Sequence, residues 1–536
     1  MRLAKKVAAA LLCAATVLSV SPTFEAKAAK INSYTYNYDY WGHEYESPDV
    51  YKPIEFIDGV SLGVDLIRGG QSLFVIDNLL YIVDSGTNRI IEIKLNKEGA
   101  ELVREIKEFT VSDPNNIPDN FLEPIRDSNG NLTGEKKAPS EFPFTFNQPS
   151  DIFVTKNGDM YIADTSNHRV LHMTNDLVLI KVIYLPSDNT VEQQKDFLPT
   201  KLAVDPAGRI LVTAKNVNKG IFRFEYNGEF LGFMGATKVK ISFKDRLTML
   251  FASEEKKNLM GAAVPTEYSN VYIDGNAFVY CVTDSVDEAE ADAGTATPIR
   301  KLNSYGDDIL IRNGWEAPMG DIVWDDTEGY NGPSLMADIT AMDDESYYCI
   351  DRVRGRIFGY NDQGQLLYAF GSPGNKLGYF TTPTAIEHYG TDLLVLDYFS
   401  GGVTRFRRTE FGSMLHSALD LYQDGKYEES GDVWREVIKQ NGDYEYAYIG
   451  IGRALLREKK YGEALKYFET MKDSKNYSRA WKKYRKEWIE KNMGVVVAVI
   501  IVLACISPVI KTIKKIRWEA RLEYEYERKQ RKKKNK

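Results

Sequence analysis

The chain has 536 residues, of which 43% are hydrophobic and 12% aromatic, so it is long enough for two or three globular domains with sizeable cores. Forty glycines and 33 tyrosines against 19 prolines favour a β-rich fold with many tight turns over a helical bundle. The formal net charge is −8, divided between a basic C-terminus and an acidic remainder. An acidic remainder argues against nucleic acid as a ligand.

Residues 1–28 predict a signal peptide. Basic residues precede an apolar run over residues 7–20, and the small-residue cleavage signal Ala26-Lys27-Ala28 follows. A basic flank, a short apolar run and small residues in this order are typical of secretion. We therefore expect the following chain to be delivered across a membrane.

Residues 29–50 form an aromatic N-terminal segment. Tyrosines alternate with other residues from Tyr34 to Tyr40, and Trp41 follows. This period of two predicts an edge strand or a collar on the next domain. A face that stacks on carbohydrate is the open alternative.

A repeated unit fills most of the chain. Its clearest copy has a strand, a turn at Asn157-Gly158, a second strand that ends at Asp164, and a polar turn that ends at Arg169. Two good echoes and three weaker copies follow the same order, and their second strands end at residues 84, 164, 214, 283, 351 and 397. A unit of about 46–50 residues with insertions in three places predicts six propeller blades.

This unit resembles the NHL repeat, most closely over residues 149–170. The resemblance implies a mainly β fold, a six-bladed NHL-type β-propeller over residues 51–410. In domain order the chain is also similar to bacterial cell-surface NHL proteins with a short tetratricopeptide stalk and a C-terminal membrane anchor. Residues 52–59 mirror the outer-strand stretch 365–371, so we expect the N-terminal strand to complete the last blade and close the ring.

The polar turns of the repeat are expected to be structural. An Asp side chain accepts backbone hydrogen bonds in a tight turn, and the Arg that ends the turn can bridge back to the carboxylate. We therefore expect nine turn residues to hold the fold rather than a ligand. They are Asp84, Asn88, Arg89, Asp164, Asn167, Arg169, Asp351, Arg356 and Asp397.

Insertions and cysteines mark the rest of the repeat region. The insertions cover residues 112–146, residues 237–268 with an amphipathic helical stretch, and the acidic loop 287–292, and loops on a rigid scaffold commonly bind ligands. Cys281 and Cys349 lie in equivalent strands of neighbouring repeats. We therefore expect buried free thiols rather than a disulfide.

After residue 411 the apolar period changes from two to 3.6. Leu421, Tyr427, Ser430 and Trp434 recur 34 residues later as Leu455, Tyr461, Ala464 and Phe468. This is the tetratricopeptide period, so residues 411–490 predict a small all-α, TPR-like region.

Residues 494–510 carry no charge and predict a single transmembrane helix. The tail 511–536 has twelve Lys or Arg against four Glu, a net charge of +8, so we expect it to be cytoplasmic. Its basic cluster 528–536 should attract anionic lipid. Residues 1–28 carry +3, which leaves −19 on residues 29–493, the expected extracytoplasmic part of a single-pass cell-membrane protein.

The sequence carries no strong catalytic signature. It lacks H-E-x-x-H, paired-cysteine and G-x-S-x-G motifs, so we expect no catalytic residue. The candidates for the central channel are Asp151, Lys201, Asp338 and Glu387. A set that includes a lysine does not look like a metal cage, so no cofactor is expected, although a divalent metal in the channel stays open.

These observations predict a membrane-anchored binding or scaffold protein rather than an enzyme, with a protein, peptide or glycan partner. The alternative is a propeller hydrolase or lyase, similar to the gluconolactonase or peptide-amidating lyase types, that uses the central channel. A third hypothesis is an accessory role beside a membrane transporter. A ring of carboxylates around a divalent ion would favour the enzyme, whereas an apolar or basic channel would favour binding.

Overall fold

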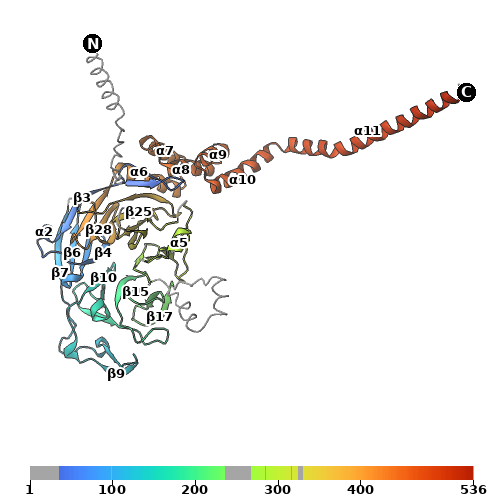
Figure 1. The fold of residues 1–536 in the computed structure, drawn as a ribbon. Coiled ribbons are helices and arrows are strands. Elements are labelled where there is room, and N and C mark those ends of the chain that lie inside the picture. The colour runs from blue at the N-terminus through green and yellow to red at the C-terminus, as the bar shows by residue number, and fades with distance from the viewer. Residues whose placement is uncertain are drawn as a thin grey trace, which may run out of the picture. The chain divides into compact units, whose positions relative to one another are not determined.

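The computed structural model describes residues 35–97, 99–235, 267–283, 285–314, 317–323 and 330–534 (Figure 1). It divides into two compact units, residues 1–413 and 414–536, which are taken separately below. The expected signal peptide and the helical stretch expected at residues 243–260 lie outside the described residues.

The first unit is a six-bladed β-propeller, as predicted (Figure 1). Each blade is an antiparallel sheet whose innermost strand contacts the innermost strand of the next blade, and β27 returns to β4, so the ring closes. The strands of blades one to three are β4 (Gly70–Ile76), β5 (Leu79–Asp84), β6 (Arg89–Leu95), β7 (Ala100–Ile106); β10 (Pro149–Val154), β11 (Met160–Asp164), β12 (Arg169–Met173), β13 (Leu179–Ile183); β14 (Pro199–Val204), β15 (Ile210–Ala214), β16 (Ile221–Phe224) and β17 (Phe230–Met234). Those of blades four to six are β18 (Asn270–Ile273), β19 (Val279–Val282), β20 (Ile299–Leu302); β23 (Met336–Ala341), β24 (Tyr347–Asp351), β25 (Arg356–Tyr360), β26 (Leu366–Phe370); β27 (Pro383–Tyr389), β28 (Asp392–Asp397), β29 (Gly402–Arg408) and β3 (Tyr51–Asp58).

The second strand of each blade carries the strongest apolar pattern because it is covered on both faces. β11 and β28 are buried at every position, and such strands form continuous apolar runs rather than alternating ones. The second strands end at, or one residue before, the six predicted reference positions. The apolar side chains of neighbouring blades form shared clusters, for example Ile162 of blade two with Val83 of blade one.

The ring is closed by the N-terminal strand, as predicted. β3 pairs antiparallel with β29 and becomes the outer strand of the sixth blade, with Val403 opposite Ile57. A blade built from both ends of the propeller sequence leaves no exposed edge at the seam.

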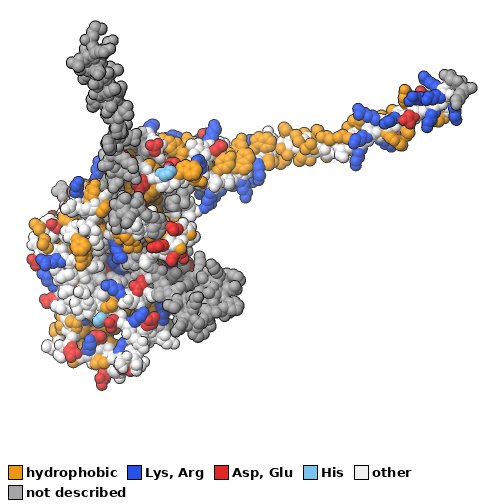
Figure 2. All heavy atoms as spheres, in the orientation of Figure 1, with side chains coloured by type: hydrophobic (Ala, Val, Ile, Leu, Met, Phe, Trp, Pro, Cys, Tyr) orange, Lys and Arg blue, Asp and Glu red, His pale blue; other side chains and the backbone are white. Residues whose placement is uncertain are grey.

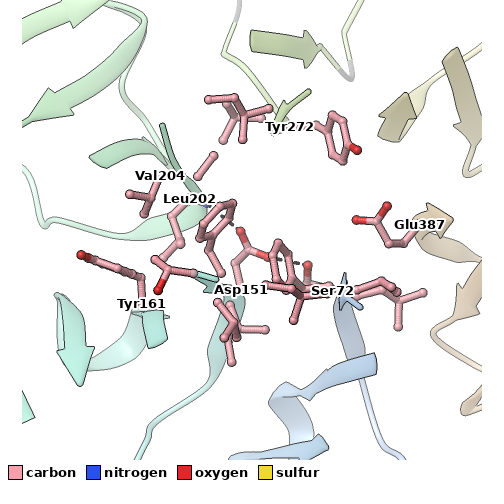
Figure 3. Close-up of a pocket in the computed structure, with 18 of the residues that line it drawn as sticks. Ser72, Asp151, Tyr161, Leu202, Val204, Tyr272 and Glu387 are labelled. Carbon is pink, nitrogen blue, oxygen red and sulfur yellow. Dashed lines mark hydrogen bonds between the residues drawn. The ribbon is translucent and has the colours of Figure 1, made fainter. Parts of the chain in front are cut away.

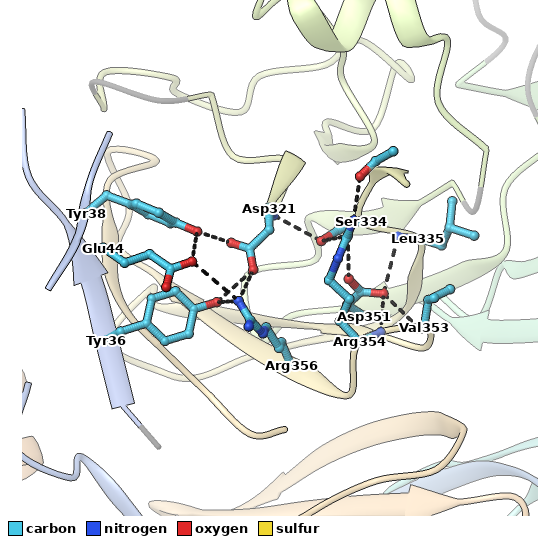
Figure 4. Close-up of polar contacts among 12 residues, drawn as sticks. Tyr36, Tyr38, Glu44, Asp321, Ser334, Leu335, Asp351, Val353, Arg354 and Arg356 are labelled. Carbon is cyan, nitrogen blue, oxygen red and sulfur yellow. Dashed lines mark hydrogen bonds and ion pairs between the residues drawn. The ribbon is translucent and has the colours of Figure 1, made fainter. Parts of the chain in front are cut away.

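The aromatic N-terminal segment is an edge strand. β1 (Thr35–Tyr38) pairs with β26, and β2 (Glu44–Glu46) pairs with β1, so the fifth sheet has six strands. The hydroxyls of Tyr36 and Tyr38 donate to Asp321 at 2.8 and 2.6 Å (Figure 4). These tyrosines are therefore used to hold the strand on blade five rather than to display a stacking face.

Arg356 departs from the expected turn pairing. It lies opposite Asp351 in the strand register, as Arg89 lies opposite Asp84, but its Nη1 donates to Asp321 at 2.6 Å (Figure 4). Arg354 contacts Asp351 in its place, at 3.4 Å. Since Arg354 contacts that carboxylate, Arg356 instead holds Tyr36 of β1 and Asp321, which directly precedes β21 (Ile322–Val323) and its partner β22 (Gly332–Pro333), on the blade.

Two of the insertions have described structure. Residues 112–146 contain the hairpin β8 (Pro124–Arg126) and β9 (Leu132–Lys136), with the short turns η2 (Asp119–Phe121) and η3 (Pro139–Glu141). The other short turns, η1 (Ser85–Thr87) and η4 (Thr165–Asn167), are polar turns of the repeat. The acidic loop forms α5 (Glu288–Asp292), α2 (Gly59–Leu62) follows β3, and β21 (Ile322–Val323) pairs with β22. Cys281 and Cys349 are buried free thiols on β19 and β24, as expected.

The C-terminal unit is helical. Its helices are α7 (Tyr427–Gln440), α8 (Glu445–Arg457), α9 (Tyr461–Thr470), α10 (Ser474–Lys491) and α11 (Met493–Lys534), and α6 (Glu410–Gln423) spans the boundary between the units. Trp434 and Phe468, which are 34 residues apart, each pack against a glycine of α8: a Cβ on Gly450 would lie 2.4 Å from the indole nitrogen, and one on Gly452 would lie 2.6 Å from the phenyl ring. The equivalent small residues Ser430 and Ala464 are fully buried.

α11 is one continuous helix of 42 residues that contains the apolar run and the basic tail as far as Lys534. Among the described residues it is the one helix long and apolar enough to cross a membrane. Its apolar side chains, such as Val495, Ile500 and Leu503, are exposed.

Candidate functional site

The propeller channel contains a cavity of about 750 Å³. All six inner strands contribute to its wall, and the turns between the first and second strands of the blades form its rim. Figure 3 shows Tyr272 and Glu387 on one side of this space, with Tyr161, Val204 and Leu202 on the other. The volume is in the range of sites that enclose small molecules.

A second cavity of about 620 Å³ is lined by residues from the polar turns that follow the second strands, among them Ser85, Asn216 and Tyr398. Lys201 lines both cavities. The two cavities therefore meet near Lys201, in the ring of inner strands.

A polar ring separates the two cavities. Most inner strands have a β-bulge near their start, and the residue after the bulge has its side chain in the channel wall. The polar residues at this level are Ser72, Asp151, Lys201, Asn270 and Asp338, and all are buried. Three of the predicted channel residues thus lie on this one ring.

One side of the ring is joined by hydrogen bonds across three blades. Ser72 Oγ donates to Asp151 Oδ1 at 2.5 Å, and Lys201 Nζ donates to Ser72 Oγ at 2.9 Å. The backbone N–H of Leu202 donates to Asp151 Oδ2 at 2.6 Å. Asp151 therefore ties blade two to blade three, which is a structural use of the carboxylate.

Asp338 makes the same kind of tie between blades five and six. Its two oxygens accept the backbone N–H groups of Ile339 and Ile386 at 2.7 and 2.8 Å. Burial raises the pKa of Asp338 to about 7, although Lys201 and the two backbone donors act in the opposite direction. Burial also raises the pKa of Asp151, and here too Lys201 opposes it.

Glu387 is on β27, in the wall of the larger cavity beyond the polar ring. Its Oε1 accepts from Thr340 Oγ1 at 2.8 Å and from the backbone N–H of His388 at 2.9 Å. The His388 ring lies 3.1 Å from the same oxygen. Burial alone would lower the pKa of His388, but its hydrogen bond to Glu387 and the charges of Glu387, Asp343 and Asp344 raise it overall.

The polar turns hold buried ion pairs. Arg89 donates to Asp84 at 3.0 Å and Arg169 donates to Asp164 at 2.8 Å, and both pairs are almost completely buried. Asn167 also donates to Asp164, whereas Asn88 accepts from the backbone N–H of Gln148 in the next blade. Asp397 has a glycine opposite it and accepts backbone N–H groups of Thr381, Thr382, Phe399 and Ser400.

Metal binding finds no ready site in the described part of the chain, where no group of three or more His, Cys, Asp or Glu could hold an ion. In the channel, the carboxylate of Asp151 already accepts a side-chain and a backbone donor, and that of Asp338 accepts two backbone donors. The positive charge of Lys201 acts on both carboxylates and lowers their pKa values. The donor set of the ring therefore does not fit a divalent cation.

Two cavity residues, Tyr272 and His388, had no signal in the sequence. Tyr272 reaches across a blade boundary and donates to the carbonyl of Ala341 at 3.1 Å. His388 directly follows Glu387, a predicted channel residue, so its place beside that carboxylate is evident in the sequence. Its contact with Thr340 of the neighbouring blade is not.

Comparison with known proteins agrees with the fold. The sequence profile of the NHL repeat matches residues 146–173. NHL repeat-containing protein 3 is 32% identical in Homo sapiens and 29% identical in Mus musculus over 104 residues, which is 19% of this chain and 29% of each relative. A virginiamycin B lyase from Staphylococcus aureus aligns with 12% identity and a TM-score of 0.38 over 67% of this chain and 100% of the lyase.

Proposed function

Because the chain is a six-bladed β-propeller that contains an NHL repeat, we propose that it is a membrane-anchored binding or scaffold protein whose propeller faces the extracytoplasmic side. The observation that supports binding is the cavity of about 750 Å³, which is formed by rigid inner strands. Its ring residues are already joined to one another and to neighbouring blades. A preformed cavity loses little conformational entropy when a ligand binds.

The helical unit serves as a second docking site in this proposal. Trp434 and Phe468 are 34 residues apart, and each packs against a glycine of α8. This repeat of a packing contact supports a TPR-like arrangement. Paired helices of this kind present faces that can hold a peptide or a protein segment. A membrane transporter beside the anchor remains one candidate for this partner.

The anchor is α11, whose apolar part crosses the bilayer and whose basic end stays on the cytoplasmic side next to anionic lipid. The adjoining helix supports this placement. α10 carries seven Lys or Arg against two Glu and exposes Trp481, Tyr484 and Trp488. Trp and Tyr directly before an apolar helix are typical of the membrane–water interface on either side. The basic residues of α10 do not favour the extracytoplasmic side, but the tail 511–536 has twelve Lys or Arg against seven on α10, so the larger basic excess is on the proposed cytoplasmic side.

A lyase or hydrolase that uses the channel is the second candidate, and the Glu387–His388 pair is the observation that favours it. These two groups could exchange a proton with a substrate in the cavity. Thr340, which contacts both, is fully buried and cannot be the attacking nucleophile without a rearrangement.

Site-specific photo-crosslinking in native membranes tests the proposal. A photoreactive residue is placed at Gly275 on the cavity rim, at Phe399 next to the polar-turn cavity, and at Leu132 on the insertion hairpin as an exposed control. A specific adduct at Gly275 supports binding at the larger cavity. Two outcomes would contradict the proposal: adducts at Leu132 equal to those at Gly275 and Phe399, or no adduct at either Gly275 or Phe399.

A further inference from the structure

The larger cavity has a strongly acidic wall. Two of its charged lining residues are lysines and seven are carboxylates. The carboxylates are Asp77, Asp151, Asp159, Asp205, Asp274, Asp338 and Glu387. Clefts lined by one sign of charge concentrate ions of the opposite sign, so this wall favours cations over anions.

Arg209 and Lys301, which do not line the cavity, pair with Asp205 and Asp274 at 2.6 and 3.8 Å. The two lining lysines do not cancel the charge of the other carboxylates. Lys201 donates to Ser72 Oγ and to the carbonyl of Gln71, and it lies 3.9 Å from Asp151. Its positive charge is therefore paired with Asp151 inside the polar ring. Lys156 is exposed on the β10–β11 turn, where solvent screens it.

Glu387 has a carboxylate oxygen directed into the cavity. Its side chain is 7% exposed, and its hydrogen-bond partners, Thr340 and His388, both contact Oε1. Within the described residues Oε2 has no hydrogen-bond donor, and Figure 3 shows the carboxylate pointing into the open space. Because this oxygen is open to the cavity, an N–H group of a ligand can donate to it in place of water.

Aromatic rings complete the wall. Phe74 and Phe153 lie 4.8 Å apart between their ring centroids, and Tyr161 and Tyr272 line the same space. Aromatic faces attract ammonium and guanidinium groups, and they do so more strongly away from bulk water.

We infer that this cavity binds an organic cation through an ammonium or guanidinium group, with Glu387 Oε2 as the acceptor of its N–H donors and the aromatic rings against its alkyl part. This inference rests on the proposed binding function and names the chemical class of its ligand. The cation can be a polyamine or a basic side chain of a peptide, since both present the same group. The cavity volume suits such a ligand rather than a bare metal ion, for which the described residues offer no ligand group.

The test is calorimetric titration of the full-length protein in neutral detergent with spermidine, and with 1,8-octanediol as an uncharged probe of similar length. Spermidine should bind and the diol should not. Glu387→Gln, which keeps an oxygen for Thr340 to donate to, should weaken spermidine binding about tenfold because a charged acceptor is replaced by a neutral one. Glu135→Gln on the exposed strand β9 removes the same charge outside the cavity and should leave the affinity unchanged.

A second pair of variants does not touch the buried wall. A Cβ on Gly275 would meet nothing within 4 Å, so the rim tolerates new side chains there. Gly275→Lys should weaken spermidine binding several-fold and Gly275→Gln should not, because only the lysine repels the cation.

Trilysine amide, a basic tripeptide, is titrated beside spermidine, and the cation that binds more tightly identifies the source. The inference is overturned if neither cation binds better than the diol, or if Glu387→Gln and Gly275→Lys both bind the tighter cation like their controls. If crosslinks form at Gly275 while neither cation binds, the binding function stands and only the cationic class fails.

Discussion

Arg169 Nε donates to Asp164 Oδ2 at 2.8 Å, and the exposed fractions of the two side chains are only 1% and 0%. Removal of one partner from such a pair leaves an uncompensated charge in the core. We expect Asp164→Ala to lower the free energy of unfolding by about 3 kcal/mol, measured by denaturant titration. Asp176→Ala, at an exposed position of the same blade, should change it by less than about 0.5 kcal/mol. A large loss of ligand binding without a change in stability would instead give Asp164 a role in the binding site.

The tyrosine contacts to Asp321 hold the edge strand on blade five. Tyr36 Oη donates to Asp321 and accepts from Arg356 Nη1 at 2.8 Å, and the ring is buried. Tyr36→Phe should therefore speed hydrogen exchange of the β1 and β2 amides at least tenfold, since about 1.5 kcal/mol of hydrogen bonding to charged groups is lost. Tyr305→Phe at an exposed turn is the control. Equal exchange in the two variants would show that the Tyr36 hydroxyl is not needed to hold the strand, which β-sheet pairing and the Tyr38–Asp321 hydrogen bond would then hold.

The stability of the helical unit depends on the packing of the Trp434 ring against Gly450. A methyl group at residue 450 would lie 2.4 Å from the indole nitrogen, so Gly450→Ala must displace α8 or the ring. We expect a loss of about 1–3 kcal/mol by overpacking, which exceeds the gain of about 1 kcal/mol in helix propensity. Gly442→Ala, where a methyl group has an ordinary contact at 3.9 Å, should not lower stability. Limited proteolysis of the helical unit distinguishes the two, and equal rates would contradict this packing.

Asp338 makes propeller stability depend on pH. Burial raises its folded-state pKa to about 7, above the value of about 3.9 in an unfolded chain, so the folded state holds the proton more tightly. The stability from this group is complete below the unfolded pKa and is lost as pH rises through the folded pKa. The difference in stability between the wild type and Asp338→Asn should therefore fall between about pH 4 and 7 and then become constant. A difference that rises with pH in this window would mean that the amide donors and Lys201 outweigh burial.

The same cavity should bind a cation more tightly at higher pH. As pH rises from about 6 to 8, Asp338 gains its negative charge, and this change favours a cation. Loss of the His388 proton, which is held more tightly than on a free imidazole, acts in the same direction. Calorimetric titration with spermidine at several pH values measures this, and His388→Gln should reduce the dependence. The charged groups that face these two residues are Lys201 and Glu387 around Asp338, and Glu387, Asp343 and Asp344 around His388. A constant affinity from pH 6 to 8 would contradict the assignment of Asp338 to the binding cavity.

The repeat could be located from the sequence because its second strands are buried on both faces, and this forces continuous apolar runs that end at a polar turn. Asp164 and Arg169 follow from the same local logic, since both lie in one turn. Arg356 could not be assigned in this way. Its partner Asp321 is 35 residues away in sequence, in the irregular segment between β20 and β23.

The cavity was harder to predict for a similar reason. Asp151, Lys201, Asp338 and Glu387 could be placed on inner strands by their position in the repeat. Their contacts depend on which blades adjoin across the channel: Lys201 of blade three contacts Ser72 of blade one. Such contacts depend on ring closure, and no local pattern encodes them.

The orientation of the chain in the membrane is the claim on which an extracytoplasmic ligand depends. Tyr305 is 88% exposed on the propeller, and Gln530 lies in the basic end of α11. Native Cys281 and Cys349 are buried and give little background to a thiol reagent, whereas Cys505 on α11 is exposed. Cys505→Ser is therefore introduced into both of the following variants. Tyr305→Cys and Gln530→Cys are prepared separately in the full-length chain.

The direct measurement is labelling of intact cells with a membrane-impermeant maleimide. The account predicts labelling of Tyr305→Cys at once and of Gln530→Cys only after the membrane is permeabilised. Labelling of Gln530→Cys in intact cells, with Tyr305→Cys protected, would contradict it.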